Sequence, residues 1–400
     1  MFNRGALFLL LGTIGSQVIP IMLLPFISRL YSAEEFATLS IFMALSGFFS
    51  IIFTLKLELG IPVSKNNRSA SELYRATILI AILLYILTTL FIFLFINVGG
   101  EIFSLKNHEL LLIPTCSFLL ALININQSYL NYFTKYQVMA LNRFVNSVGN
   151  NLFNLIYVMN LTYGAIFGLF ASCLFVTRFK ELSVKKNRIL KAYVTLKRNS
   201  IFPKTTLPHA LINSLKINSI PIVFPLLFSK TELGYYFFAN KILLLPSMLI
   251  GASVAQVFFR SIAKRYNEHK SIEKNVLFYM LTLFLIAAIP SLLTFEFLPD
   301  LFGFVFGDSW IISGEYAKMF LPYIVLHFVA SSSSVILIVI KKQKQALYWG
   351  VIESIMFVFI FLVGSLVGLS VTDVLFTVSM IFSVYFPVYF IWIYKSVRNA

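Results

Sequence analysis

The sequence predicts an all-α membrane protein that crosses a lipid bilayer many times. Apolar segments of roughly 20 residues recur along the chain with short polar loops between them, and a segment of that length crosses the hydrocarbon core as one helix. Of the 400 residues, 59% are hydrophobic and 12% are charged, and the mean hydropathy is +0.87. A soluble protein of this size needs more polar surface than this composition provides.

The polar breaks between the apolar segments predict about twelve membrane spans. Their predicted limits are 5–30, 36–60, 76–97, 110–133, 141–161, 163–179, 206–229, 235–258, 276–298, 318–340, 347–369 and 373–394. The shortest turn runs from Thr162 to Gly164 and separates the fifth span from the sixth. The side of the membrane on which every later loop lies depends on this turn.

Lysine and arginine residues gather in alternate loops, which predicts the orientation because short basic loops stay in the cytoplasm. The densest of these loops runs from Arg178 to Lys204, and both termini fall on its side of the membrane. Most acidic residues fall in the loops of the opposite side. This topology accounts for nearly all of the net charge of +16. We therefore expect contact with anionic lipid headgroups and no nucleic-acid binding.

A short pattern near the N-terminus recurs about half a chain later. The first copy is Ile19-Pro20-Ile21, Pro25, Ser28-Arg29 and Glu35, and the second is Ile220-Pro221-Ile222, Pro225, Ser229-Lys230 and Glu232. The repeat predicts two six-helix bundles, 1–195 and 196–400, around a central cavity, as in many transporters. The alternative is a chance match of short apolar strings.

Two lysines fall inside predicted spans, where an unpaired charge is costly. Lys216 lies about ten residues into the seventh span, near the middle of the bilayer, and shares a helical face with His209 and Asn213. Lys241 lies on the eighth span beside Asn240. Because a lysine at the bilayer centre cannot easily extend to the headgroups, we expect these residues to line the cavity.

Neutral amide side chains form further stripes inside the spans. Asn146, Asn150 and Asn154 recur every four residues on the fifth span, and Asn124, Gln127 and Asn131 share a face of the fourth. Such stripes either line a polar cavity or join neighbouring helices through hydrogen bonds. Their number favours the cavity.

Three titratable residues inside the spans are candidates for ion coupling. Glu58 continues a polar face of the second span, whereas Lys56 lies about 200° away on a continuous helix and would extend to the headgroups. His327 and Glu353 lie on the tenth and eleventh spans, and buried groups of both types bind and release protons. A histidine that only packs between helices is the alternative.

Several strings resemble polysaccharide-biosynthesis flippases of the Wzx type, from residue 1 to the end of the tenth span. The strings are Leu30-Tyr31-Ser32-Ala33-Glu34-Glu35-Phe36, Leu55-Lys56-Leu57-Glu58-Leu59-Gly60-Ile61-Pro62, Leu233-Gly234-Tyr235-Tyr236, Leu245-Pro246-Ser247 continuing to Gln256-Val257-Phe258, and the outer loop Phe306-Gly307-Asp308-Ser309-Trp310 with Gly314-Glu315-Tyr316. Their order and spacing are specific. One departure is Ala37, where the second copy has Gly234.

The resemblance implies the fold of the multidrug/oligosaccharidyl-lipid/polysaccharide exporter superfamily. It implies a flippase that moves an undecaprenyl-diphosphate-linked oligosaccharide from the cytoplasmic to the periplasmic leaflet of the bacterial inner membrane, alongside other polysaccharide-assembly membrane proteins. A diphosphate requires cations, which Lys216 and Lys241 supply, and sugar hydroxyls suit the amide stripes.

Two alternatives belong to other classes. A membrane-embedded polymerase or glycosyltransferase would be an enzyme, and such enzymes carry a sizeable outer loop, whereas the longest here runs only from Pro299 to Ala317. A drug exporter of the same superfamily favours embedded carboxylates, which are few and scattered here. Without a nucleotide-binding loop or metal-ligand spacing, we expect a transporter with no catalytic residues, cofactor or metal. The oligosaccharide and the coupling ion are not predicted.

Overall fold

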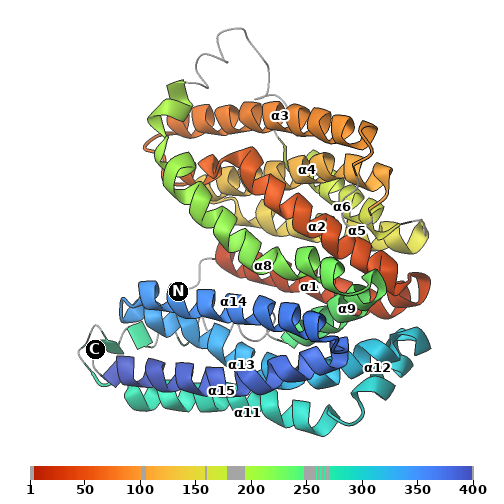
Figure 1. The fold of residues 1–400 in the computed structure, drawn as a ribbon. Helices are drawn as coiled ribbons and strands as arrows, with labels where there is room; N and C mark the ends of the chain where they lie inside the picture. The colour runs from red at the N-terminus through yellow and green to blue at the C-terminus, as the bar shows by residue number, and fades with distance from the viewer. Residues whose placement is uncertain are drawn as a thin grey trace. The chain divides into compact units, whose positions relative to one another are not determined.

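The computed structural model describes residues 4–100, 105–157, 160–177, 194–246, 258, 262, 263, 265, 266, 268 and 270–398, without the side chains of residues 4–14, 216 and 217. The described residues form helices, turns and loops and no strand. The chain divides into two compact units, Met1–Ile222 and Val223–Ala400 (Figure 1). The predicted division into 1–195 and 196–400 stays a prediction.

Within the residues that the structure describes, the first unit contains six complete helices of 16 to 31 residues and several shorter elements. The long helices are α1 (Arg4–Leu30), α2 (Ala33–Thr54), α3 (Asn67–Asn97), α4 (Asn107–Tyr132), α5 (Tyr136–Ile156) and α6 (Leu161–Val176). A 3-10 helix η1 (Leu57–Gly60) precedes α3, and a π-helical turn η3 (Phe202–Thr206) leads into α8 (Leu207–Leu227). The boundary between the two units falls within α8.

The second unit begins in α8 and continues to the end of the chain. Its helices are α9 (Lys230–Pro246), α11 (Glu273–Thr294), α12 (Leu298–Phe306), the 3-10 turn η5 (Asp308–Trp310), α13 (Ile311–Val339), α14 (Gln343–Val367) and α15 (Val371–Arg398). In Figure 1 the blue helices α13 and α15 run beside one another, and they pack closely.

The helices match the predicted membrane spans. Within the described residues, seven helices are long and apolar enough to cross a membrane, and Phe202–Leu215 with Asn218–Leu227 forms an eighth if the bent pair is one span. The segment Gly15–Leu30 and helix α6 are apolar but shorter. Each of the twelve predicted spans contains a helix. The prediction of an all-α, multi-pass membrane protein is therefore confirmed.

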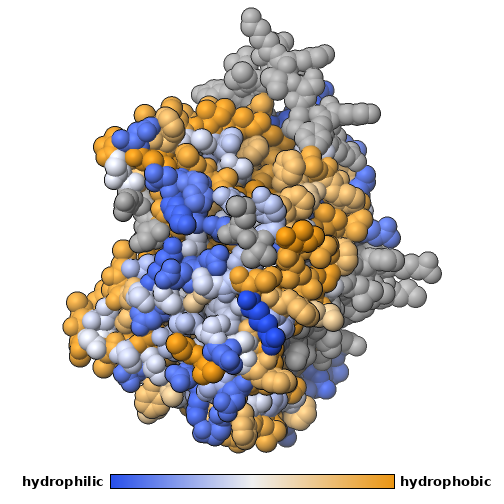
Figure 2. Space-filling view, turned by 90° about the vertical axis from the view of Figure 1, so that its right-hand side faces the viewer, coloured by the Kyte–Doolittle hydropathy of each residue, from blue (hydrophilic) through white to orange (hydrophobic). Residues whose placement is uncertain are grey.

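Large hydrophobic side chains lie on the outside of these helices. Phe91 of α3 is 66% exposed, Phe278 of α11 is 73% exposed and Leu366 of α14 is 77% exposed. Hydrophobic residues cover broad areas of the face in Figure 2. An apolar surface of this extent is unfavourable in water and is suited to contact with lipid.

One long helix in each unit has a similar set of neighbours. In the first unit α4 packs against α2, α3 and α6, and in the second α13 packs against α9, α11 and α15. Counted along the repeat, α13 corresponds to α4 and α14 corresponds to α5. The second unit differs by the short helix α12 between α11 and α13.

The two copies of the sequence pattern also begin their second helices alike. The Ser32 amide donates to the Glu35 carboxylate at 2.8 Å before α2, and the Ser229 amide donates to the Glu232 carboxylate at 2.8 Å before α9. Each serine hydroxyl accepts a hydrogen bond from the glutamate amide, which completes a capping box. The capping boxes match Ser229 with Ser32 rather than with Ser28. The two copies still differ by four residues in length, and with this match the gap falls before the serine instead of before the glutamate.

The predicted outer loop from Pro299 to Ala317 is instead largely helical, because it contains α12, η5 and the first turns of α13. Gly307 ends α12 with φ +107°, a backbone conformation that favours glycine. The chain then turns and buries Trp310, whose ring stacks on Phe238 of α9 with centroids 3.9 Å apart. Apolar residues that we assigned to a loop form a small core.

Candidate functional site

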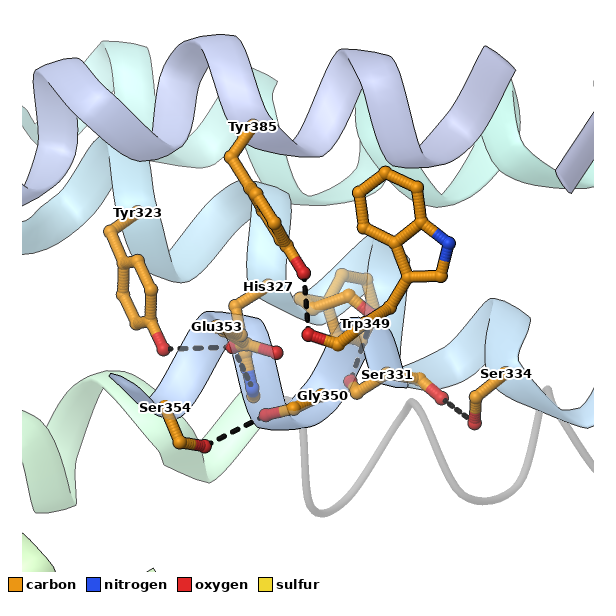
Figure 3. A network of polar contacts seen from close by, with 10 residues as sticks. Tyr323, His327, Ser331, Ser334, Trp349, Gly350, Glu353, Ser354 and Tyr385 are labelled. Carbon is orange, nitrogen blue, oxygen red and sulfur yellow. Dashed lines mark hydrogen bonds and ion pairs between the residues drawn. The ribbon is translucent and has the colours of Figure 1, made fainter. Parts of the chain in front are cut away.

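A cluster of three titratable side chains joins α13 to α14 in the second unit (Figure 3). The Tyr323 hydroxyl donates to Glu353 Oε1 at 3.2 Å. His327 Nε2 lies 3.6 Å from the same oxygen. One carboxylate oxygen therefore faces both a phenol and an imidazole, which is an arrangement that can hold a proton and pass it on.

The helices position these side chains with little freedom. Tyr323 and His327 are four residues apart on α13, so they lie one turn apart on one face, and their rings stack with centroids separated by 5.5 Å. Phe382 and Phe386 of α15 pack against the Tyr323 ring. The cluster is consequently held in an aromatic environment, where a charge costs more than in water.

Neighbouring polar groups form hydrogen bonds with the backbone rather than with Glu353. The Tyr385 hydroxyl donates to the Trp349 carbonyl at 2.6 Å, and Ser331 donates to the Phe328 carbonyl at 3.1 Å (Figure 3). The side chains of His327 and Glu353 remain 33% and 19% exposed. Neither side chain is therefore fully enclosed by the helices around it.

The sequence identified His327 and Glu353 separately, and the structure brings them together. Tyr323 was missed. Its spacing of four residues from His327 was the available signal.

In the first unit, amides join α4, α5 and α6. Gln127 Nε2 donates to Asn142 Oδ1 at 3.1 Å. Asn142 Nδ2 then donates to the Ser172 carbonyl at 2.8 Å and hydroxyl at 2.7 Å. Asn142 is buried and lies four residues before Asn146, so it extends the stripe of three asparagines by one turn, and our sequence interpretation missed it.

The asparagine stripe of α5 lies against α6. Asn154 is buried and donates from Nδ2 to Asn150 Oδ1 at 3.0 Å. A Cβ on Gly164 of α6 would lie 2.0 Å from Asn154 Oδ1, so the absence of a side chain there makes room for the amide. Asn146 is half-buried on α5, and Asn124 is exposed on α4. At Asn150 and Asn154 the contacts have the form of helix packing.

The expected separation of Lys56 from Glu58 was wrong. The argument required a continuous helix, but α2 ends at Thr54, and Leu55 and Lys56 adopt left-handed conformations with φ 49° and 58°. The turn brings Lys56 Nζ within 3.4 Å of Glu58 Oε1. Glu58 is buried, and within the described residues its Oε2 has no hydrogen-bond partner.

The remaining predicted residues lie on α8 and α9. The side chain of Lys216 is outside the part of the chain that the structure describes. His209 and Asn213 are exposed on α8, and Asn240 and Lys241 are half-buried on α9. Their role in a cavity stays a prediction.

Comparison with solved structures identifies the class of fold. An inward-facing multidrug resistance MATE family transporter of the MOP superfamily aligns with a TM-score of 0.66 and 15% identity, covering 98% of this chain and 94% of that one. The lipid II flippase MurJ in its inward closed conformation aligns with a TM-score of 0.68 and 18% identity, covering 98% and 87%. The chain has the fold of the MOP-superfamily transporters.

Sequence comparison then identifies the family. The profile of the family described as polysaccharide biosynthesis protein matches residues 2–259, which is more than half of the chain. The chain belongs to this family. A search of curated protein sequences gives no match.

Proposed function

We propose that this protein is a flippase for an undecaprenyl-diphosphate-linked oligosaccharide. It moves this substrate from the cytoplasmic to the periplasmic leaflet of the bacterial inner membrane, with both termini in the cytoplasm. The observation that carries the proposal is the combination of family and fold: a polysaccharide biosynthesis family member shares the MurJ fold over 98% of its length. Translocation forms no covalent bond, so no catalytic residue is required.

In this proposal the two repeats alternate between states open to either side, and the substrate passes at their interface. Lys216, near the middle of the bilayer, and Lys241, on the eighth span, bind the diphosphate. Exposed amides such as Asn124 and Asn213 contact sugar hydroxyls. The Glu353 cluster binds a proton on one side and releases it on the other, which drives the change of state.

Deletion of the gene from its host tests this function. We expect loss of the surface polysaccharide and accumulation of undecaprenyl-diphosphate-linked oligosaccharide that glycan-modifying enzymes reach only from the cytoplasmic side. Re-expression should restore both. Normal surface polysaccharide in the deletion strain, with unchanged leaflet distribution of the lipid, would exclude the function.

A drug exporter is the second candidate, because the fold is equally that of the MATE transporters. The same deletion strain separates the two functions. If the protein is an exporter, the deletion strain should be more sensitive to cationic compounds and should keep its surface polysaccharide. If the protein is a flippase, the strain should lose its surface polysaccharide and keep its normal sensitivity to cationic compounds.

Replacement of Lys216 tests the cationic binding site. Lys216→Ala should abolish complementation of the deletion strain at normal protein levels, and Lys216→Arg should retain some activity because the charge survives. Lys344, which is exposed at the start of α14, provides the control, and Lys344→Ala should complement fully. Normal export by Lys216→Ala would remove this lysine from the proposed site without changing the family assignment.

A further inference from the structure

The first unit contains a polar cavity of about 470 Å³ that the transport proposal does not use. It lies where the loop between η1 and α3, the first turn of α3 and the residues before η3 come together. Its charged and amide lining consists of Lys65, Asn66, Arg68, Glu72, Arg198 and Asn199.

The charges of the cavity come from segments far apart in the sequence. Arg68 is paired with Glu72 at 3.2 Å. Lys65 and Arg198 also line the cavity, and neither has a carboxylate partner among the residues that the structure describes. A positive-inside topology explains why these loops are basic. It does not explain why Lys65 and Arg198, more than 130 residues apart, face one cavity.

The formal charge of the cavity suits a diphosphate. Three cations and one carboxylate give a net charge of +2, and a diphosphate esterified at both ends carries two negative charges. The N-terminus of α3, a helix of 31 residues, lies at this cavity. The Asn66 side chain caps the helix by accepting a hydrogen bond from the Ser69 amide at 2.8 Å. The dipole of a helix adds a partial positive charge at that end.

Hydrophobic side chains beside the cavity favour a ligand carried by a lipid. Val63 lines the cavity and is 75% exposed, and Ile201 and Leu59 nearby in the chain are 64% and 46% exposed. A cationic site bordered by exposed apolar residues is typical of a surface at the membrane interface. A binding site for a free anion in solution has no need of this border.

We infer that this cavity binds the diphosphate headgroup of the lipid-linked substrate in the cytoplasmic leaflet, before translocation. This inference rests on the proposed flippase function and adds a second phosphate site to it, separate from Lys216 and Lys241. Lys65 and Arg198 contact the phosphate oxygens, and the lipid chain extends past Val63 and Ile201.

Binding of undecaprenyl diphosphate to the purified full-length protein in nanodiscs of neutral lipid tests the inference. The charge-removing variant Lys65→Gln/Arg198→Gln should bind at least about tenfold more weakly than the wild type, because two charge-assisted contacts are lost. The control Lys197→Gln/Lys135→Gln removes two exposed charges that do not line the cavity and should bind normally. Lys65→Arg/Arg198→Lys should retain most of the binding.

Competition identifies the source of the phosphate. We expect undecaprenyl diphosphate to bind much more tightly than inorganic diphosphate or phosphatidylglycerol. Equal binding of inorganic diphosphate would overturn the role of the lipid, and equal binding of phosphatidylglycerol would overturn the role of the diphosphate. Unchanged binding by Lys65→Gln/Arg198→Gln would overturn the site itself. None of these results affects the deletion experiment, which tests the flippase function independently.

Discussion

The same pair of helices is joined by different chemistry in the two units. In the first unit, α4 is joined to α5 by neutral amides, Gln127 and Asn142. In the second unit, the corresponding helices α13 and α14 are joined by Tyr323 and Glu353, with His327 beside them. Amide side chains do not titrate, whereas carboxylate and imidazole side chains are titratable groups. Within the residues that the structure describes, the bridge between α4 and α5 is therefore made of neutral amides, whereas the bridge between α13 and α14 contains titratable groups.

The strongest test of this comparison is Glu353→Gln. The amide keeps the size of the side chain but cannot bind and release a proton, so we expect nearly complete loss of export at normal protein levels. Complementation of the deletion strain and a membrane immunoblot measure the two quantities. Export at the wild-type rate would show that the cluster, like the amides of the first unit, only joins helices.

Tyr323→Phe should reduce transport less than Glu353→Gln does. The variant removes one hydrogen bond to Glu353 Oε1 and keeps the aromatic packing, so we expect transport to fall by about tenfold. The pH dependence of transport should also change, because the environment of the carboxylate changes. Tyr385→Phe is the matched control, since that hydroxyl donates to the Trp349 carbonyl, and its pH profile should stay that of the wild type. Identical profiles for all three proteins would remove Tyr323 from the coupling mechanism.

Asn142→Leu should affect stability rather than transport. The change removes three hydrogen bonds between α4, α5 and α6 and leaves the Gln127 amide without its acceptor. We expect the free energy of unfolding to fall by about 2 kcal/mol. Thermal unfolding in detergent measures this loss, and transport per folded molecule should be unchanged. A transport defect at normal stability would instead assign a functional role to the first unit's amides.

The sequence was sufficient for the spans because helix length and hydrophobicity are local properties of the chain. Contacts between spans are not local, so Glu353 and His327 could be identified as unusual but not as partners. Lys56 and Glu58 were misjudged for a related reason. Their relation depends on where α2 ends, and left-handed conformations at Leu55 and Lys56 carry no glycine or proline signal. The core around Trp310 was missed because short apolar segments between spans resemble loops.

The smallest expected effects concern the two capping boxes, before α2 and before α9. Substitutions there test whether the two copies of the sequence pattern are equivalent at the position where their hydrogen bonds are most alike. Ser32→Ala and Ser229→Ala should each reduce stability by about 1 kcal/mol, because each leaves a helix N-terminus without its side-chain acceptor. Ser28→Ala is the comparison variant, since that hydroxyl donates to the Pro25 carbonyl within α1 and does not cap a helix N-terminus. Thermal unfolding of the three variants measures the differences. If Ser28→Ala matched Ser229→Ala while Ser32→Ala had no effect, the repeat would have to be aligned at Ser28, and the correspondence of α4 with α13 would need independent support.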